Sequence, residues 1–172
     1  TDLTPARDGE TVEQRTVRFR TVGDITCTCP VESDAATAAD IVIEAATENY
    51  DLKVKIIKQI DAMVGPEVII ASNTSSISIT KLAAVTSRAD KFIGMHFFNP
   101  VPMMALVEII RGLQTSDATH AAVETMAKAL GKTPITVKNA PGFVVNRILV
   151  PMINEAFFVL AEGLATPEDI DA

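Results

Sequence analysis

The chain has 172 residues, of which 48% are apolar and 22% are charged, and its formal net charge is −7. A chain of this length can bury a sizeable hydrophobic core. The acidic balance and the lack of a basic block argue against a nucleic-acid partner. The two cysteines, Cys27 and Cys29, are too few for a zinc site, so we predict no metal and free thiols in a reducing compartment.

No apolar run reaches the ~18 residues that a membrane-spanning helix needs. The most apolar stretch, residues 148–160, is interrupted by Pro151, Asn154 and Glu155. The first residues are polar and charged, and they lack the pattern of a signal peptide. We therefore expect a cytoplasmic protein with no membrane partner.

The N-terminal part has only weak structural signals. A weakly alternating run at residues 15–22 and a short β-prone run at residues 25–29 flank Gly23 and Asp24, which are typical of a hairpin turn. Residues 30–39 predict a loop or an irregular helical turn. We treat residues 1–24 as a poorly defined N-terminal segment.

From residue 40 the sequence alternates between strands and helices. Apolar runs at residues 41–43, 68–71 and 92–95 predict strands that are buried on both faces. Helices are predicted at residues 49–64 and 79–85. The first helix is amphipathic, with an inward set of Leu52, Ile56, Ile60 and Met63 and an outward set of Lys53, Lys55, Lys58 and Asp61. Three such alternations predict a parallel, doubly wound sheet.

The next strand, predicted at residues 106–110, follows the third one too closely for a helical crossover, so we expect these two strands to be antiparallel. Residues 116–130 predict a helix that Ser116 caps and Gly131 ends. A further strand is predicted at residues 133–137. The Asn-Ala-Pro-Gly sequence that follows predicts a linker.

The composition changes at residue 140. Residues 144–161 predict one long helix, kinked at Pro151, with an inward set of Val145, Leu149, Met152, Ala156 and Leu160. Thr166 followed by Pro167 predicts the start of another helix. The fold class is therefore α/β. We predict an incomplete Rossmann-like domain over residues 25–139, followed by the start of an all-helical dimerisation domain over residues 140–172.

Polar residues follow each predicted parallel strand. Thr47 and Glu48 follow the first strand, residues 72–76 follow the second, and His96 and Asn99 follow the third. Ligands of open α/β sheets bind outside these carboxyl ends, so we expect a lined crevice there. Simpler roles stay open, because the serines can cap the next helix and Glu48 can be an ordinary first-turn acid.

Glu108 lies in the apolar segment Leu-Val-Glu-Ile-Ile and needs a partner, because an unpaired buried carboxylate is costly. His96 on the preceding strand is the obvious candidate, and a carboxylate that holds an imidazole makes it a suitable general base. A structural histidine, or a pair between Glu108 and Arg111, stays open as the alternative. These residues predict an α/β enzyme with a His–Glu base and hydroxyl donors, without a named substrate.

Four segments resemble the 3-hydroxyacyl-CoA dehydrogenases in their order and spacing, and the bacterial 3-hydroxybutyryl-CoA dehydrogenases look most similar. They are ADIVIEAATENYDLK, VIIASNTSSISI, FIGMHFFNPVPMMALVEII and NAPGFVVNRI. The family oxidises the 3-hydroxyl group of an acyl-CoA to a ketone and passes hydride to NAD. The resemblance therefore implies an NAD-dependent oxidoreductase of fatty-acid metabolism (β-oxidation), with an acyl-CoA such as 3-hydroxybutyryl-CoA as substrate.

The resemblance also implies roles for individual residues. It implies a catalytic set of four, namely the base His96, its carboxylate partner Glu108, the hydrogen-bonding Ser75 and the substrate-side amide Asn146. It implies a set on the NAD side of the crevice, namely Glu48, Lys53, Asn73, Ser75 and Asn99. A homo-oligomer formed through the C-terminal helices is implied as well.

The sequence departs from the family pattern in two respects. It contains no G-x-G-x-x-G loop to bind the pyrophosphate and no identifiable acidic residue for the adenosine ribose, and only the first helix and a stub of the helical domain are present. A dehydrogenase present as a fragment or as part of an assembly stays open beside a non-catalytic remnant or assembly module. The chain alone is expected to bind NAD weakly and to show little activity. A crotonase-type hydratase is poorly supported, because nothing resembles the oxyanion loops of that fold.

Overall fold

The computed structural model describes residues 17–20, 29–32 and 41–172, and the chain forms two compact units, residues 1–38 and 39–172. In the first unit, β1 (Val17–Arg20) and β2 (Cys29–Glu32) pair antiparallel. The predicted loop over residues 30–39 is therefore wrong for residues 30–32, where an outer strand tolerates the missing amide of Pro30. The predicted turn at Gly23 and Asp24 lies outside the described residues.

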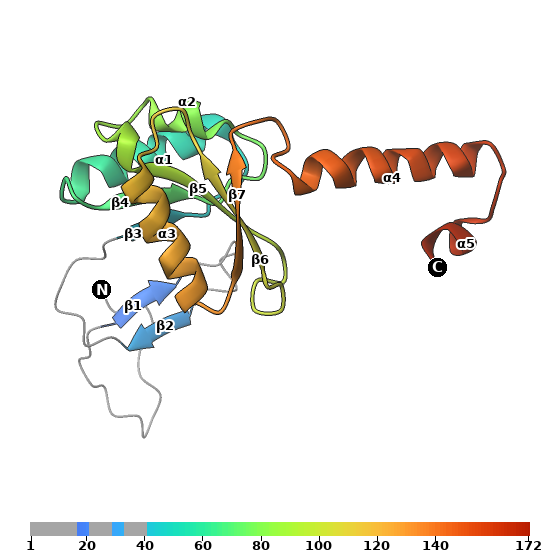
Figure 1. Cartoon of the computed structure of the whole chain (residues 1–172), viewed down its shortest axis with the longest axis horizontal. Helices are drawn as coiled ribbons and strands as arrows, with labels where there is room; N and C mark the ends of the chain where they lie inside the picture. Colours follow the sequence, from blue (N-terminus) through green and yellow to red (C-terminus); the bar gives the residue numbers. More distant parts are fainter. Residues whose placement is uncertain (1–16, 21–28, 33–40) are drawn as a thin grey trace, which may run out of the picture. The chain divides into compact units, whose positions relative to one another are not determined.

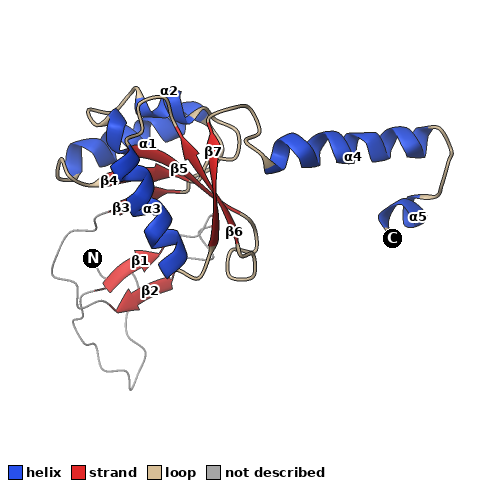
Figure 2. Cartoon of the chain, viewed as in Figure 1, coloured by secondary structure: helices blue, strands red, loops and turns tan. Residues whose placement is uncertain are grey.

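The second unit is built on a five-stranded sheet in the order β3-β4-β5-β6-β7 (Figure 2). Its strands are β3 (Ile41–Glu44), β4 (Ile69–Ser72), β5 (Phe92–Phe97), β6 (Leu106–Arg111) and β7 (Thr133–Lys138). The first three are parallel, β6 is antiparallel to β5, and β7 is parallel to β6. The predicted parallel strands and the predicted antiparallel step are both confirmed.

Helices cover both faces of this sheet (Figure 1). On one face lie α1 (Tyr50–Met63) and α2 (Ile79–Ala83), and a short 3-10 helix, η2 (Ala89–Lys91), precedes β5. On the other face lies α3 (Asp117–Ala129), which Ser116 caps as predicted. Alternate residues of each strand face opposite sides, so Phe92 packs with Ile57 of α1 while Ile93 packs with Val123 of α3. This arrangement is the predicted Rossmann-like α/β fold.

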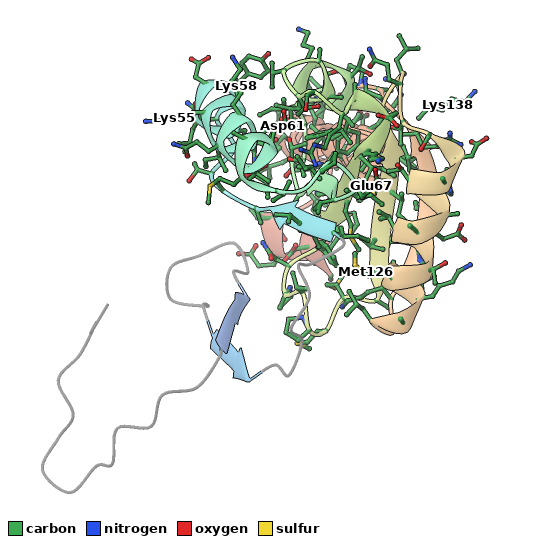
Figure 3. The ribbon with its side chains drawn as sticks, turned by 90° about the vertical axis from the view of Figure 1, so that its left-hand side faces the viewer. Lys55, Lys58, Asp61, Glu67, Met126 and Lys138 are labelled. Carbon is green, nitrogen blue, oxygen red and sulfur yellow. The ribbon has the colours of Figure 1, made fainter. Side chains whose placement is uncertain are left out.

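The predicted inward face of α1 is only partly right: Ile60 packs against the core, but the buried face is displaced by about one residue, a rotation of about 100° at 3.6 residues per turn. The buried residues of α1 are Lys53 and Ile57, whereas Leu52 and Met63 are 40% and 85% exposed. Lys55 and Lys58 do point outward, as Figure 3 shows. Lys53 faces the interior because its ammonium has hydrogen-bond partners there, namely Glu44 and the carbonyl oxygen of Ala46.

Two further predictions of burial are wrong. Strand β3 lies at the edge of the described sheet, so Ile43 is 37% exposed instead of being covered on both sides. Helix α4 (Val145–Ala161) has the predicted length, and α5 (Pro167–Asp171) follows after its cap Thr166. No residue of α4 is buried, however.

Candidate active site

His96 and Glu108 face each other across β5 and β6, where the two residues are register partners. Nδ1 of His96 lies 2.7 Å from Oε2 of Glu108, and both side chains are buried. The predicted contact is therefore present. The alternative pair with Arg111 does not form, because Arg111 donates to Asp117. Since a carboxylate can only accept, Nδ1 of the neutral imidazole carries the proton and Nε2 keeps a free lone pair.

The second oxygen of Glu108 binds the start of α4. Oε1 accepts hydrogen bonds from the amides of Val144 and Val145, at 2.9 and 3.0 Å. First-turn amides have no partner inside their own helix, and the helix dipole favours a negative charge at this end. The carboxylate thus joins β6 to the helical segment. The sequence analysis missed this partner, although the glycine of the Asn-Ala-Pro-Gly linker indicated a tight turn.

The imidazole of His96 packs against two aromatic rings. Its centroid lies 4.6 Å from that of Phe98 and 5.8 Å from that of Phe143, which meets it edge-on. Phe143 is almost fully buried and has a φ of +50°, next to Gly142 at +73°. The turn of the linker therefore places an aromatic wall beside the imidazole, and this wall restricts how the ring can reorient.

Glu48 shapes the loop that follows β4. Its Oε1 accepts hydrogen bonds from Oγ1 of Thr74 at 2.6 Å, the amides of Ser75 and Ser76 at 3.0 and 2.8 Å, and Oγ of Ser76 at 2.9 Å. Partial burial acts to raise the pKa of Glu48. The hydrogen bonds from Thr74 and Ser76, together with the charge of Lys53, outweigh this effect and hold the pKa below its ordinary value of 4.5. The residue is thus an ionised anchor for the serine loop.

Lys53 is wholly buried, contrary to the predicted outward position. Its Nζ lies 2.9 Å from Oε1 of Glu44 and 2.8 Å from the carbonyl oxygen of Ala46. Glu44 also accepts a hydrogen bond of 2.6 Å from Oγ of Ser72, its register partner on β4. Glu44 was not predicted as part of the site, and Ser72, expected among the polar residues of the crevice, is fully buried in this cluster. The signal was a lone carboxylate at the end of a β-branched run, the same signal that identified Glu108.

Ser75 and Asn146 border one groove of about 650 Å³ between the loop after β4 and the start of α4. Nδ2 of Asn146 donates to the carbonyl oxygen of Ser75 at 3.4 Å. Pro141 and Val150 contribute apolar walls, and Arg147 contributes a positive charge. The predicted meeting of the sheet side and the helical side of the site is therefore present.

The two predicted asparagines differ in their surroundings. Oδ1 of Asn73 accepts the amide of Phe97 at 2.8 Å and so ties the end of β4 to the end of β5. Asn99 is exposed, and within the described residues its side chain makes no hydrogen bond. The cofactor roles of both residues stay predictions. Among the described residues there is no cluster of three metal-binding side chains, and none of their helices is long and apolar enough to cross a membrane.

These features define a class of protein. A Rossmann-like sheet carries, at the carboxyl ends of its strands, a buried imidazole–carboxylate pair, a serine loop and a groove, which is the arrangement of a dinucleotide-dependent oxidoreductase. The sequence profile of the 3-hydroxyacyl-CoA dehydrogenase NAD binding domain matches residues 9–140, and that of the C-terminal domain of the same enzymes matches residues 142–172. The chain belongs to the 3-hydroxyacyl-CoA dehydrogenase family.

Similar proteins agree with this assignment. The chain is 54% identical over 138 residues to a probable 3-hydroxybutyryl-CoA dehydrogenase of Bacillus subtilis, covering 80% of this chain and 48% of that protein. It is 46% identical over 147 residues to the human mitochondrial hydroxyacyl-coenzyme A dehydrogenase, covering 84% and 47%. The crystal structure of (S)-3-hydroxybutyryl-CoA dehydrogenase from Ralstonia eutropha matches with 85% identity and a TM-score of 0.74, covering 76% and 46%. The chain thus spans about half the length of these relatives.

Proposed function

We propose that the chain carries the proton-transfer site of an NAD-dependent dehydrogenase that converts a 3-hydroxyacyl-CoA, such as 3-hydroxybutyryl-CoA, into a 3-ketoacyl-CoA in cytoplasmic fatty-acid metabolism. The observation that supports this most is the buried contact of 2.7 Å between His96 and Glu108. The contact leaves Nε2 of His96 as the proton acceptor, while the chain around it supplies hydroxyl and amide groups for an oxygen-rich substrate.

The proposed reaction moves one proton and one hydride. Nε2 of His96 takes the proton of the 3-hydroxyl group as the C–O bond becomes a carbonyl. Bound NAD would supply the acceptor for the hydride that leaves carbon 3. Glu108 stabilises the resulting imidazolium through Oε2, while its Oε1 accepts from the amides of Val144 and Val145. Ser75 orients the reacting oxygen, and Asn146 binds the thioester carbonyl from the helical side of the groove.

The residues on the cofactor side fit the nicotinamide end of NAD. Oε1 of Glu48 is saturated by the serine loop, but within the described residues its Oε2 accepts no hydrogen bond, and the side chain is 36% exposed. A free carboxylate oxygen of this kind can accept from a carboxamide NH₂ group. We therefore assign Glu48 to direct contact with the cofactor, and Asn73 to holding the ends of β4 and β5 together.

The test distinguishes a site that can catalyse the reaction from a non-catalytic module. Residues 41–172 replace the matching segment of the full-length Ralstonia eutropha enzyme, and reduction of acetoacetyl-CoA is followed by the absorbance of NADH. We expect the chimera to turn over, and the same chimera with His96→Ala to lose most of its turnover. A chimera that folds and binds NAD but does not turn over would favour the alternative, a non-catalytic module. Calorimetry of NAD with the 172-residue chain alone is expected to show weak binding.

We also propose that the protein self-associates through its C-terminal helices. Helix α4 exposes a set of large apolar side chains that includes Ile148, Met152, Phe157 and Phe158, and none of its residues is buried, whereas α3 buries Val123 and Ala127. Apolar surface of this extent is normally covered by a partner. Sedimentation velocity should show a dimer or larger species that dissociates when Phe157 and Phe158 are changed to serine. A monomer at micromolar concentration would contradict this proposal.

A further inference from the structure

A buried charge cluster lies beneath the serine loop, on the α1 face of the sheet. Its members are Glu44 at the end of β3, Ser72 at the end of β4 and Lys53 in the first turn of α1, and all are at most 3% exposed. Oε1 of Glu44 accepts from Nζ of Lys53 at 2.9 Å and from the amide of Ala46 at 2.6 Å, while Oε2 accepts from Ser72 at 2.6 Å. Neither carboxylate oxygen is left unpaired.

A second carboxylate, Glu48, connects this cluster to the serine loop of the candidate site. Nζ of Lys53 lies 3.8 Å from Oε2 of Glu48, too far for a hydrogen bond but within range of a charge interaction that helps to lower the pKa of Glu48. The Oε1 atom of Glu48 holds the amides of Ser75 and Ser76. A continuous series of contacts therefore leads from the buried Glu44, through Lys53 and Glu48, to the loop that presents Ser75.

Burial of the ammonium limits what Lys53 can do. The Nζ atom has acceptors in Glu44 and in the carbonyl oxygen of Ala46, and the side chain is 1% exposed. A group enclosed in this way cannot contact a bound cofactor without first leaving its partners. A buried ammonium without a counter-charge is costly, so the position of Lys53 under Glu48 depends on Glu44.

We propose that Glu44 is a positioning residue of the site: it fixes the Lys53 ammonium beneath Glu48 and thereby holds the 74–76 loop, with Ser75, in its observed conformation. This inference rests on the proposed function only for its consequence, the placement of Ser75 beside a bound substrate. The contacts themselves can be tested without turnover.

The experiment measures hydrogen exchange of the Ser75 and Ser76 amides by NMR in the purified 172-residue chain. Glu44→Gln removes the charge with little change of shape. We expect exchange at these two amides to accelerate by about tenfold or more, since each depends on a hydrogen bond to a charged acceptor. The matched control is Asp61→Asn, which breaks the Asp61–Arg88 pair at the other end of α1 and should lower stability without a selective effect on the loop.

A double-mutant cycle distinguishes positioning from a general loss of structure. If Glu44 acts through Glu48, Glu44→Gln should add no further acceleration in a Glu48→Gln background. Additive effects, or unchanged exchange in the single Glu44→Gln variant, would overturn the proposal. If Glu44→Gln does not fold, the same exchange measurement is made on Ser72→Ala. This change removes one hydrogen bond to Glu44 and keeps the charges of Glu44 and Lys53. Faster exchange at Ser75 and Ser76 would support the proposal and unchanged exchange would overturn it, whatever the chimera assay shows about catalysis.

Discussion

Two buried carboxylates, Glu44 and Glu108, lie on the same face of the sheet. They differ in whether a partner keeps an atom that can accept a proton. Glu44 meets an ammonium, an amide and a hydroxyl, so every polar atom around it is used. Glu108 meets two helix amides and one nitrogen of an imidazole, whose other nitrogen keeps a lone pair. Burial and pairing are thus common to both. Only the cluster with a remaining proton acceptor can do acid–base chemistry, and the saturated one can only hold its neighbours in place.

The largest effect is expected from removing the proton acceptor. His96→Ala in the active chimera should lower turnover by about 10²–10⁴-fold, which is the usual contribution of a general base. The change should leave NAD affinity nearly intact, because Glu48, the residue that we assign to direct contact with the cofactor, lies in the loop between β3 and α1. The measurement is steady-state reduction of acetoacetyl-CoA together with calorimetry. Ordinary turnover in the variant would remove His96 from the mechanism.

Glu108→Gln tests the difference between the two carboxylates most selectively. The amide oxygen of glutamine can still accept from Val144 and Val145, but its NH₂ group must donate to Nδ1 of His96, which moves the ring proton to Nε2. We expect loss of most of the contribution of the base, about 100-fold or more, at little loss of stability. Turnover and urea unfolding of the same preparation provide the two measurements. A severe loss of stability with normal turnover would reverse this assignment.

Gly94 lies between the two clusters, paired in register with Ser72 on one side and Ile110 on the other. A Cβ atom there would lie 2.8 Å from Cδ1 of Ile79 and 2.9 Å from Cβ of Ile110, so α2 could not approach the sheet as closely. Gly94→Ala should therefore lower the free energy of unfolding by about 1–3 kcal/mol, the usual effect of overpacking. Chemical denaturation measures it. Gly65→Ala is the control, since a Cβ at Gly65 meets no atom within 4 Å.

The smallest effect concerns pH. Partial burial acts to raise the pKa values of Glu48 and Asp61, but hydrogen bonds and neighbouring cations hold both below their ordinary values of 4.5 and 3.8. A depressed pKa in the folded state means that the contribution to stability is complete above the unfolded-state pKa and is lost as the pH falls through the folded-state pKa. The free energy of unfolding should decline below about pH 4.5, and less steeply in Glu48→Gln. Equal slopes in the two proteins would contradict the pKa direction for Glu48.

The fold was largely predictable because its signals are local. Continuous β-branched runs marked β3 and β4, Asn49 and Ser116 marked helix starts, and the short link after β5 required an antiparallel neighbour. The strand structure of residues 30–32 in β2 and the exposure of Ile43 were not predictable, because pairing and edge position depend on contacts that a sequence pattern does not specify.

The site was predictable where an isolated charge interrupts an apolar run. Glu108 was recognised in this way, and its contact with His96 is present. Lys53 was predicted on the wrong side of α1. Lysine in an amphipathic helix pattern indicates a surface position, and the pattern does not show that Glu44 lies close enough to pair with it. The link from Glu108 to the start of α4 was missed for a similar reason, since backbone amides carry no signature in the side-chain pattern.

The central claim is that Nε2 of His96 is held free to accept a proton by the contact between Nδ1 and Glu108. The most direct measurement is ¹⁵N NMR of histidine in the purified chain at pH 8, with His120→Gln to assign the second ring. We expect His96 to be protonated on Nδ1 and unprotonated on Nε2, and Glu108→Gln to reverse this tautomer. A wild-type ring protonated on Nε2, or a tautomer that does not respond to Glu108→Gln, would contradict the account.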